Sequence, residues 1–324
     1  MHAVVVEQVG GPEVLSYKDV PKPAPRTGEA LVKIGAAGVN FIDIYYRTGL
    51  YKKDTPFTVG QEGAGTIEAF GDGTDTAGFK TGDRVVFVFL AGTYADYAVV
   101  PVEKLIPVPD GVSYGDACVA MVQGMTAHYL SHDTYPIKNG DTVLVHAAAG
   151  GVGQLLVQMA KMRGARVIAT VGSDEKAKLA RGDGADEVVD YSKGDFEAEV
   201  KRITGGKGVA AVYDGVGKTT FEKGLNCLRP RGIMILYGAS SGPVPPFDLG
   251  VLAAKGSLYV TRPTLVSYTL TRQELLDRAG AVLGMIRDKK LKIRHGGEYA
   301  LRDARRAHQD LQDRKTTGKL ILTP

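Results

Sequence analysis

The spacing of hydrophobic residues follows two different patterns along the chain. Up to about residue 122, short apolar runs alternate with turns rich in glycine and proline, which is typical of β-strands. The pattern predicts strands over residues 3–6, 15–19, 30–36, 63–69, 83–89, 94–100 and 104–106. Short strands at such close spacing indicate a compact, barrel-like β domain over residues 1–122.

From residue 123 the pattern changes to strands that alternate with helices. The predicted strands cover residues 142–146, 166–171, 187–190, 209–213, 232–237 and 257–260, and predicted helices include 174–181, 195–203 and 219–228. This alternation specifies a doubly wound parallel sheet with right-handed crossovers. We therefore expect an α/β chain with a Rossmann domain over residues 123–262.

The remaining residues, 263–324, contain predicted helices at 272–287 and 302–313 and a final strand at 319–322. Roughly sixty residues fold alone only marginally. We expect this tail to return to the first domain and complete it, leaving a cleft between the two domains.

Charge and composition narrow the class of protein. A formal net charge of +4 without a block of Lys and Arg argues against a nucleic-acid reader. No apolar run approaches the ~20 residues of a membrane span, and residues 1–7 lack the basic start of a secretory signal. Two cysteines, Cys118 and Cys227, do not make a disulfide framework. We expect a cytoplasmic protein that binds neither nucleic acid nor membrane.

The turn after the first Rossmann strand is built from small residues. In the fingerprint G-x-G-x-x-G the three glycine positions are held by Ala148, Gly150 and Gly153, so the first glycine is missing. By itself the turn is also compatible with an ordinary tight connection between a strand and a helix. The six-strand context favours a dinucleotide site, because the pyrophosphate of such a cofactor binds backbone N–H groups at a helix N-terminus.

The end of the second Rossmann strand indicates which dinucleotide binds. An NAD site carries an acidic residue about 20 positions past the fingerprint, but Gly172 and Ser173 stand there. A hydroxyl, helix N–H groups and Lys176 suit a 2′-phosphate, whereas Asp174 and Glu175 are typical of a first helical turn. We predict NADPH as the cofactor.

Several longer motifs resemble a known family. They are G-G-P-E-V-L at 10–15, G-V-N-F-I-D at 38–43, A-A-A-G-G-V-G at 147–153, Y-D-G-V-G at 213–217 and G-S-L-Y-V-T-R-P at 256–263. Over essentially its whole length the chain resembles the zinc-independent NADPH:quinone oxidoreductases (the zeta-crystallin group) of the medium-chain dehydrogenase/reductase superfamily. The resemblance implies a GroES-like catalytic domain beside the Rossmann domain, and it suggests a homodimer, with the Rossmann sheets joined edge to edge.

The resemblance also implies roles for individual residues. Asn40, Asp43 and Tyr45 would lie at the catalytic end of the site, with Tyr51 at the mouth of the substrate pocket. The cofactor would contact Phe41, Ile42, Tyr129, Gly150, Gly151, Val152, Gly153, Gly172, Ser173, Lys176, Tyr191, Tyr237, Gly238, Ala239, Ser240, Val260, Thr261, Arg262 and Arg314. Gly215 departs from relatives that carry Ser, which puts a hydroxyl contact there in doubt.

Metal chemistry is not expected. Zinc alcohol dehydrogenases of this superfamily carry Cys and His where Asn40 and Gln61 stand, and an amide is not a zinc ligand. Glu62 alone does not make a site. His146 ends the first Rossmann strand, where we expect a buried, hydrogen-bonded ring. His128 and His132 share a helix face without a third ligand, and we interpret them as surface or interface residues.

Three functions compete. A quinone is already electrophilic, so positioning against the nicotinamide supplies much of the catalysis without a metal. The aromatic stretch at residues 41–51 offers flat surfaces for such a ring, although clusters of this kind are often core. Alternatives are a reductase of activated C=C bonds, and a cofactor-binding structural or RNA-binding protein. We favour NADPH-dependent reduction of a quinone.

Overall fold

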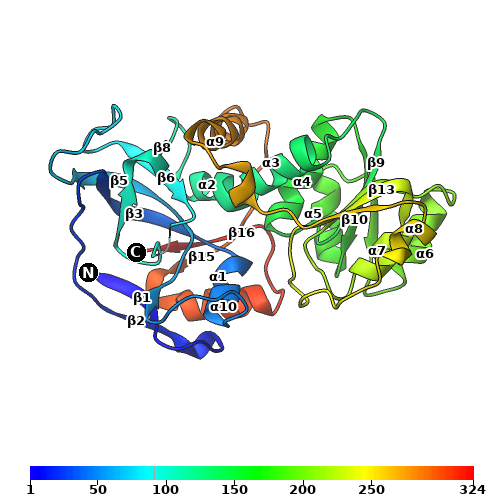
Figure 1. Ribbon diagram of the computed structural model, residues 1–324, viewed down its shortest axis with the longest axis horizontal. Coiled ribbons are helices and arrows are strands. Elements are labelled where there is room, and N and C mark those ends of the chain that lie inside the picture. The colour runs from blue at the N-terminus through cyan, green and yellow to red at the C-terminus, as the bar shows by residue number, and fades with distance from the viewer. Residues whose placement is uncertain (91) are drawn as a thin grey trace. The chain divides into compact units, whose positions relative to one another are not determined.

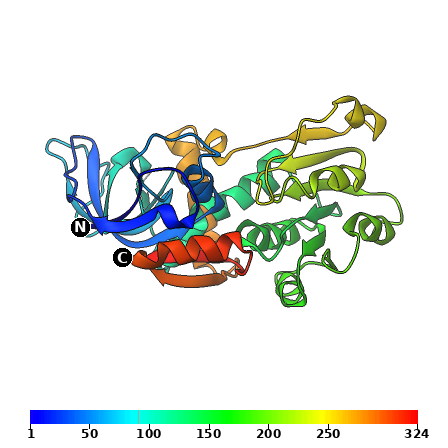
Figure 2. The same ribbon diagram turned by 90° about the horizontal axis from the view of Figure 1, so that it is seen from below.

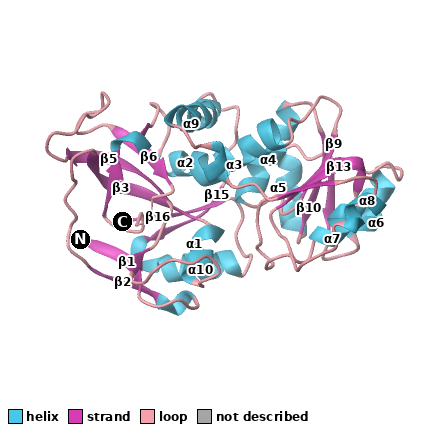
Figure 3. Ribbon diagram, viewed as in Figure 1, coloured by secondary structure: helices cyan, strands magenta, loops and turns pink. Residues whose placement is uncertain are grey.

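The computed structural model describes residues 1–90 and 92–324. It divides into two structural units, whose boundaries lie near the changes in the hydrophobic pattern. The first unit comprises Met1–Met125 and Thr269–Pro324, and the second comprises Thr126–Tyr268. The first is rich in strands and the second alternates strands with helices (Figure 3). The sequence pattern predicts boundaries after residues 122 and 262.

The second unit is built on a six-stranded parallel sheet of order β11-β10-β9-β12-β13-β14. Its strands are β9 (Thr142–Val145), β10 (Arg166–Val171), β11 (Glu187–Asp190), β12 (Val209–Asp214), β13 (Leu228–Leu236) and β14 (Tyr259–Thr261). Numbered from β9, this order is 3-2-1-4-5-6, which is that of a dinucleotide-binding Rossmann fold. The predicted fold class is confirmed.

Helices cover both faces of this sheet (Figure 1). They are α3 (Thr126–Tyr129), α4 (Gly151–Met162), α5 (Asp174–Gly182), α6 (Phe196–Ile203), α7 (Phe221–Asn226) and α8 (Gly250–Ala254). Because both faces are covered, the central strand β9 is a continuous apolar run in which Val143, Leu144 and Val145 are fully buried. The strands run parallel, so their carboxyl ends lie at one edge of the sheet, and the loops that carry the predicted cofactor residues begin there.

The first unit contains two sheets. A three-stranded sheet has the order β2-β1-β4, and a seven-stranded sheet has the order β15-β16-β3-β5-β6-β8, with β7 pairing β3. The strands are β1 (His2–Val6), β2 (Leu15–Asp19), β3 (Glu29–Val39), β4 (Phe57–Thr58), β5 (Glu62–Phe70), β6 (Arg84–Val88), β7 (Tyr97–Pro101), β8 (Ile106–Pro107), β15 (His295–Ala300) and β16 (Lys319–Thr323). The helices are α1 (Phe41–Arg47), α2 (Tyr114–Val119), α9 (Arg272–Arg287) and α10 (Ala304–Gln312).

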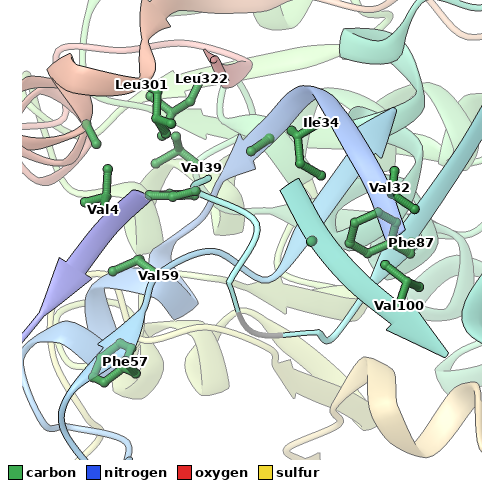
Figure 4. Close-up of a cluster of buried hydrophobic side chains, with 14 of the residues drawn as sticks. Val4, Val32, Ile34, Val39, Phe57, Val59, Phe87, Val100, Leu301 and Leu322 are labelled. Carbon is green, nitrogen blue, oxygen red and sulfur yellow. The ribbon is translucent and has the colours of Figure 1, made fainter. Parts of the chain in front are cut away.

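Residues 269–324 complete the first unit. Strand β16 pairs antiparallel with β3, and α10 lies beside the N-terminal strands, as the red and blue segments of Figure 2 show. Side chains from both ends of the chain share one core, including Val4, Val39, Leu301 and Leu322 (Figure 4). The tail therefore fixes the end of β3, from which α1 and its candidate site residues follow.

Some local features differ from the sequence pattern. Residues predicted as a strand at 104–106 belong instead to a 3-10 turn, Val102–Lys104, followed by β8. The pattern also gives no sign of the two π-helical segments, Ala120–Met125 and Leu130–Thr134. In the first of these, a Cβ on Gly124 would lie 2.6 Å from Val282 of α9, so glycine allows the close approach of the two segments. Among the described residues, no helix is long and apolar enough to cross a membrane.

Candidate active site

The N-terminus of α1 holds the centre of the first unit's candidate site. Asn40 follows β3 in extended backbone conformation (φ −136°, ψ 158°) and caps the helix. Its backbone N–H donates to Oδ2 of Asp43 at 2.8 Å, which closes one arm of a capping box. The side chains of both residues are buried, with exposures of 5% for Asn40 and 1% for Asp43. Asp43 therefore supports the shape of the helix start rather than presenting a surface.

The amide of Asn40 has a fixed orientation. The ammonium of Lys319, on β16, donates to Asn40 Oδ1 at 2.8 Å, and Asn40 Nδ2 donates to Glu62 Oε1 at 2.7 Å. Lys319 also contacts Glu62 Oε1 directly, and both of these charged side chains are fully buried. A second Asn40 N–H faces the carbonyl of Gly38 at a long 3.4 Å. This second N–H is held only weakly, so it is the Asn40 donor available to another acceptor.

Glu62 is held from a second side. Its Oε2 accepts the backbone N–H of Val122 at 2.6 Å, from the π-helical segment Ala120–Met125. Such short contacts are typical of charge-assisted hydrogen bonds. Lys319 is a site residue that the sequence analysis missed, since a lysine at the start of an apolar strand gives no sign that it is buried.

Burial changes the acidity of Asp43. Desolvation is the largest influence and raises the pKa of Asp43 to about 7, with the nearby Glu62 acting in the same direction. The Asn40 N–H, Lys319 and Tyr94 oppose the rise because they favour the carboxylate. The second carboxyl oxygen, Oδ1, has no hydrogen-bond partner among the described residues, which is consistent with a carboxyl that ionises reluctantly.

The aromatic side chains of α1 and the following loop form a cluster of rings. Tyr45 contacts Tyr51 edge to face with centroids 5.2 Å apart, and Phe41 lies 6.3 Å from Tyr45. Phe41, Ile42 and Tyr45 are half-buried, and Tyr51 is exposed. These rings are therefore not part of the closed core, and their faces can meet a flat ligand.

In the second unit, the small-residue turn brings α4 against the end of β9. Ala147 adopts a left-handed conformation (φ 51°), and its carbonyl accepts the N–H of Gly150 at 2.9 Å. A Cβ on Gly153 would lie 2.3 Å from that same carbonyl oxygen. Glycine at 153 is thus required for helix and turn to meet, and half-buried Gly151 and Val152 begin the helix at the open edge. This turn, free of long side chains, fits a dinucleotide pyrophosphate.

The ends of β10 and β11 place the predicted 2′-phosphate residues together. Val171 and Asp190 are register partners, so Gly172 and Tyr191 follow at the same edge. A Cβ on Gly172 would lie 2.8 Å from the Tyr191 hydroxyl, which shows how closely the two approach. Ser173 caps α5 by accepting the N–H of Lys176 at 3.3 Å.

The acidic residue next to Ser173, Asp174, has a cationic partner. Asp174 pairs with Lys193, and this contact lowers the pKa of Asp174. Its carboxylate is therefore partly neutralised beside the site, which is compatible with a phosphate there.

The next loops are clamped by a buried aspartate. Asp214 Oδ1, at the end of β12, accepts the N–H groups of Val216 and Gly217 at 2.7 and 3.0 Å. Across from Gly215, the ring of Tyr237 lies where a side chain would stand, because a Cβ on Gly215 would be 2.9 Å from three of its atoms. The space beside Gly215 is thus occupied by the Tyr237 ring. The predicted residues Gly238, Ala239, Ser240, Val260 and Thr261 are half-buried at this same edge, and Arg262 is exposed beside them.

Two further predicted residues have different surroundings. Tyr129 is 1% exposed and stacks on Tyr268 with centroids 4.2 Å apart. Arg314 lies in the loop before β16, in a left-handed conformation (φ 58°) with its side chain exposed. The predicted contacts of both with a cofactor stay predictions.

Three of the histidines weighed in the sequence, and both cysteines, lie in structural surroundings. His146 is fully buried and shares a 2.8 Å hydrogen bond with the Thr170 hydroxyl, as predicted. His128 and His132 stack with centroids 4.1 Å apart. Cys118 and Cys227 are buried free thiols, and burial raises the pKa of both. Within residues 1–90 and 92–324, no group of three or more His, Cys, Asp or Glu side chains is placed to hold a metal ion.

Comparison with known proteins decides the family. Residues 26–110 match the model of the alcohol dehydrogenase GroES-like domain, and residues 151–279 match that of the zinc-binding dehydrogenase. The chain is 45% identical over 317 residues to a quinone oxidoreductase of Pseudomonas aeruginosa, covering 97% of each protein. This chain belongs to the quinone oxidoreductase family.

Other members extend the comparison. The crystal structure of Escherichia coli quinone oxidoreductase complexed with NADPH superposes with a TM-score of 0.96 at 40% identity, covering all of both chains. A 2-haloacrylate reductase of a Burkholderia species is 40% identical over 333 residues, covering 99% of this chain and 98% of that protein. The family therefore includes members named for quinones and one named for an activated alkene.

Proposed function

We propose that this chain is an NADPH:quinone oxidoreductase that transfers electrons from NADPH to a quinone without a catalytic zinc. The observation that carries the proposal is full-length similarity to quinone oxidoreductases, one of them solved with NADPH. The cofactor supplies the electrons. The protein's own residues bind and orient the two reactants.

The residues at the start of α1 support this chemistry. Asn40 and Gln61 cannot supply the thiolate or imidazole that zinc requires. Their site instead contains the buried ammonium of Lys319 and an amide held in one orientation. A fixed amide N–H can donate to a quinone oxygen, where negative charge develops during reduction. Flat rings at Phe41, Tyr45 and Tyr51 suit a planar acceptor.

The function is tested by turnover. Purified protein is mixed with NADPH and either 1,4-benzoquinone or a naphthoquinone, and NADPH oxidation is followed by absorbance. We expect turnover with quinones and slower oxidation of NADH under the same conditions. Binding of NADPH without turnover of any quinone would contradict the proposal.

A second candidate function follows from the relative named 2-haloacrylate reductase. An activated C=C bond accepts a hydride at carbon and then a proton, in the same fold and with the same cofactor. The substrate panel therefore includes 2-chloroacrylate and an enone. Turnover of these compounds with a higher kcat/KM than any quinone would favour this alternative.

We further propose that Ser173, Lys176 and Tyr191 bind the 2′-phosphate of NADPH. Lys176→Met removes a cation beside that phosphate, so the ratio of kcat/KM for NADPH to that for NADH should fall about 10-fold, as loss of one charge-assisted hydrogen bond predicts. Lys178→Met on the same helix is the control, because Lys178 is exposed. An equal change in both variants would show only a general effect of charge.

Two wider proposals concern the assembly and the location. Strand β14 ends the parallel sheet, and Tyr259 on it is 61% exposed, so a second copy could extend the sheet there to form a homodimer. Sedimentation equilibrium tests this, since a single species of 34.4 kDa would contradict it. A cytoplasmic location is supported by two free, buried thiols and is tested by cell fractionation.

A further inference from the structure

A buried arginine lies at the far end of α1. Arg47 is fully buried, yet its three hydrogen-bond acceptors are uncharged. Its Nε donates to the carbonyl of Gly10 at 3.2 Å, one terminal nitrogen donates to Gln312 Oε1 at 2.7 Å, and the other faces Nδ1 of His308 at 3.1 Å. A buried guanidinium without a carboxylate partner is costly. Burial lowers the pKa of Arg47, and the charges of Glu13 and Tyr94 oppose that change.

The neighbours form a chain that leads to Asp43. Nε2 of His308 lies 3.1 Å from the hydroxyl of Tyr94, and that hydroxyl lies 3.2 Å from Oδ2 of Asp43. Tyr94 and His308 are both fully buried, and their rings meet edge to face at 5.7 Å. Arg47 and Asp43, a cation and a carboxyl on one helix, are thus joined by two neutral side chains.

The direction of every hydrogen bond in this chain follows from Arg47. A guanidinium can only donate, so Nδ1 of His308 must be the acceptor and Nε2 must carry the ring proton. Nε2 then donates to the Tyr94 oxygen, and the Tyr94 hydrogen is left to donate to Asp43. All three bonds point from the cation toward the carboxyl. Hydrogen bonds aligned in this way polarise and strengthen one another.

We propose that Arg47, His308 and Tyr94 form a one-way hydrogen-bond relay that positions Asp43 and favours its ionised form during quinone reduction. Asp43 Oδ2 in turn holds the backbone N–H of Asn40, the residue whose amide is proposed to meet the quinone. The three relay residues are positioning residues, because they act through Asp43. The inference rests on the proposed function for its link to turnover.

Protons do not travel along this relay. To pass one to Asp43, Tyr94 would need a proton from His308, and His308 would need one from Arg47, which keeps its proton in proteins. Burial, with Arg47 adding to it, lowers the pKa of His308 to about 3, so the ring stays neutral. Burial raises the pKa of Tyr94 well above its usual value. The relay therefore stabilises the Asp43 carboxylate through aligned hydrogen bonds, and no hydrogen moves from one residue to the next.

Other charged groups also act on Asp43. Burial raises its pKa, and Glu62 of β5 adds to the rise, whereas Lys319 of β16 and the Tyr94 hydroxyl oppose it. The Asp43 charge in turn acts to raise the pKa of Tyr46 and that of Lys53, which lies in the loop after α1. The relay thus contributes one of several opposing effects, and its removal should raise the pKa of Asp43 further.

The test compares two substitutions of His308. Gln can accept from Arg47 and donate to Tyr94, so His308→Gln preserves the direction of the relay, whereas His308→Leu breaks it. Tyr94→Phe removes the last donor. We expect His308→Leu and Tyr94→Phe to lower kcat/KM at about pH 6 by roughly three- to tenfold, with activity near wild type at about pH 9, because the acid limb moves to higher pH. His308→Gln should keep the wild-type profile.

Two results would overturn the relay. One is an identical pH profile in the Gln and Leu variants at position 308, which would show a packing role. The other is a ¹⁵N NMR spectrum of histidine-labelled protein in which Nδ1 of His308 carries the proton, with the signal assigned by its loss in His308→Gln. We expect a protonated Nε2 and a neutral ring near pH 7.

A readout without quinone separates this inference from the proposed function. Because the folded pKa of Asp43 lies above its unfolded value, the folded state retains a proton through the window from about pH 4 to 7, and stability falls as pH rises through it. Tyr94→Phe should extend that fall to higher pH. Absence of quinone turnover would overturn the function, whereas an unchanged pH dependence of unfolding in Tyr94→Phe would overturn the relay.

Discussion

Replacing Lys319 by Met should make the protein about 3–5 kcal/mol less stable, because it leaves a buried carboxylate without its cation. Lys319 and Glu62 are both fully buried and in direct contact. Asn40 also loses the donor to its Oδ1. The measurement is urea unfolding followed by far-UV circular dichroism, since the chain contains no tryptophan. We expect a lower midpoint and loss of quinone reduction.

A second substitution should restore much of that stability. In Lys319→Met with Glu62→Gln, the new amide can accept the Val122 N–H and donate to the Asn40 oxygen once the Asn40 amide turns over. Removing both charges leaves no unpaired ion, so the double variant should be more stable than Lys319→Met alone. Lys315→Met is the matched control, because Lys315 is exposed and pairs with Asp313 at the surface. A double variant less stable than the single one would show that the two side chains do not act as a pair.

Substitution of Gly153 should have the next largest effect. A Cβ there would lie 2.3 Å from the Ala147 carbonyl oxygen and 2.8 Å from the Ala148 Cα, and both are backbone atoms. In Gly153→Ala the helix α4 must move away from the turn, at a cost in folding stability of about 1–3 kcal/mol. The displaced N–H groups then no longer meet the pyrophosphate, so we expect NADPH to bind about 10- to 100-fold more weakly. Isothermal titration calorimetry with NADPH measures the change.

The control for this prediction is Gly182→Ala. Gly182 ends α5, and a Cβ there would meet nothing within 4 Å. Its affinity for NADPH should match that of the wild type. If Gly153→Ala also binds NADPH normally, the cofactor does not use the turn as proposed.

The Rossmann unit was predictable because its signals are local. Strands such as β10 are runs of apolar residues, and helices such as α5 start at a capping residue, here Ser173. Strand β10 has the predicted bounds, and α5 begins at the predicted residue and ends one residue later. The small-residue turn was recognisable for the same reason, since residues 147–153 are adjacent in the chain.

The buried polar groups of the first unit could not be predicted in this way. Lys319 and Asn40 are 279 positions apart, and Arg47 and His308 are 261 apart, so no spacing in the sequence relates them. In the sequence, Lys319 resembles an ordinary strand lysine and Arg47 an ordinary charge in the last helical turn. Their roles depend on β16 and α10 returning to the N-terminal strands, and that return decides which charges are removed from water. The amino-acid composition does not predict which charges are buried.

The ring of Tyr237 over Gly215 has a consequence for how these two positions can vary. The space next to the Gly215 Cα is already filled by Tyr237 atoms at 2.9 Å from any Cβ. A side chain at 215 therefore requires the outer end of the Tyr237 ring to turn aside, so the conformation of Tyr237 depends on the residue at 215. The effects of substitutions at 215 and 237 should therefore not add, because the two residues are in contact. Positions 215 and 237, on neighbouring loops, therefore share one space.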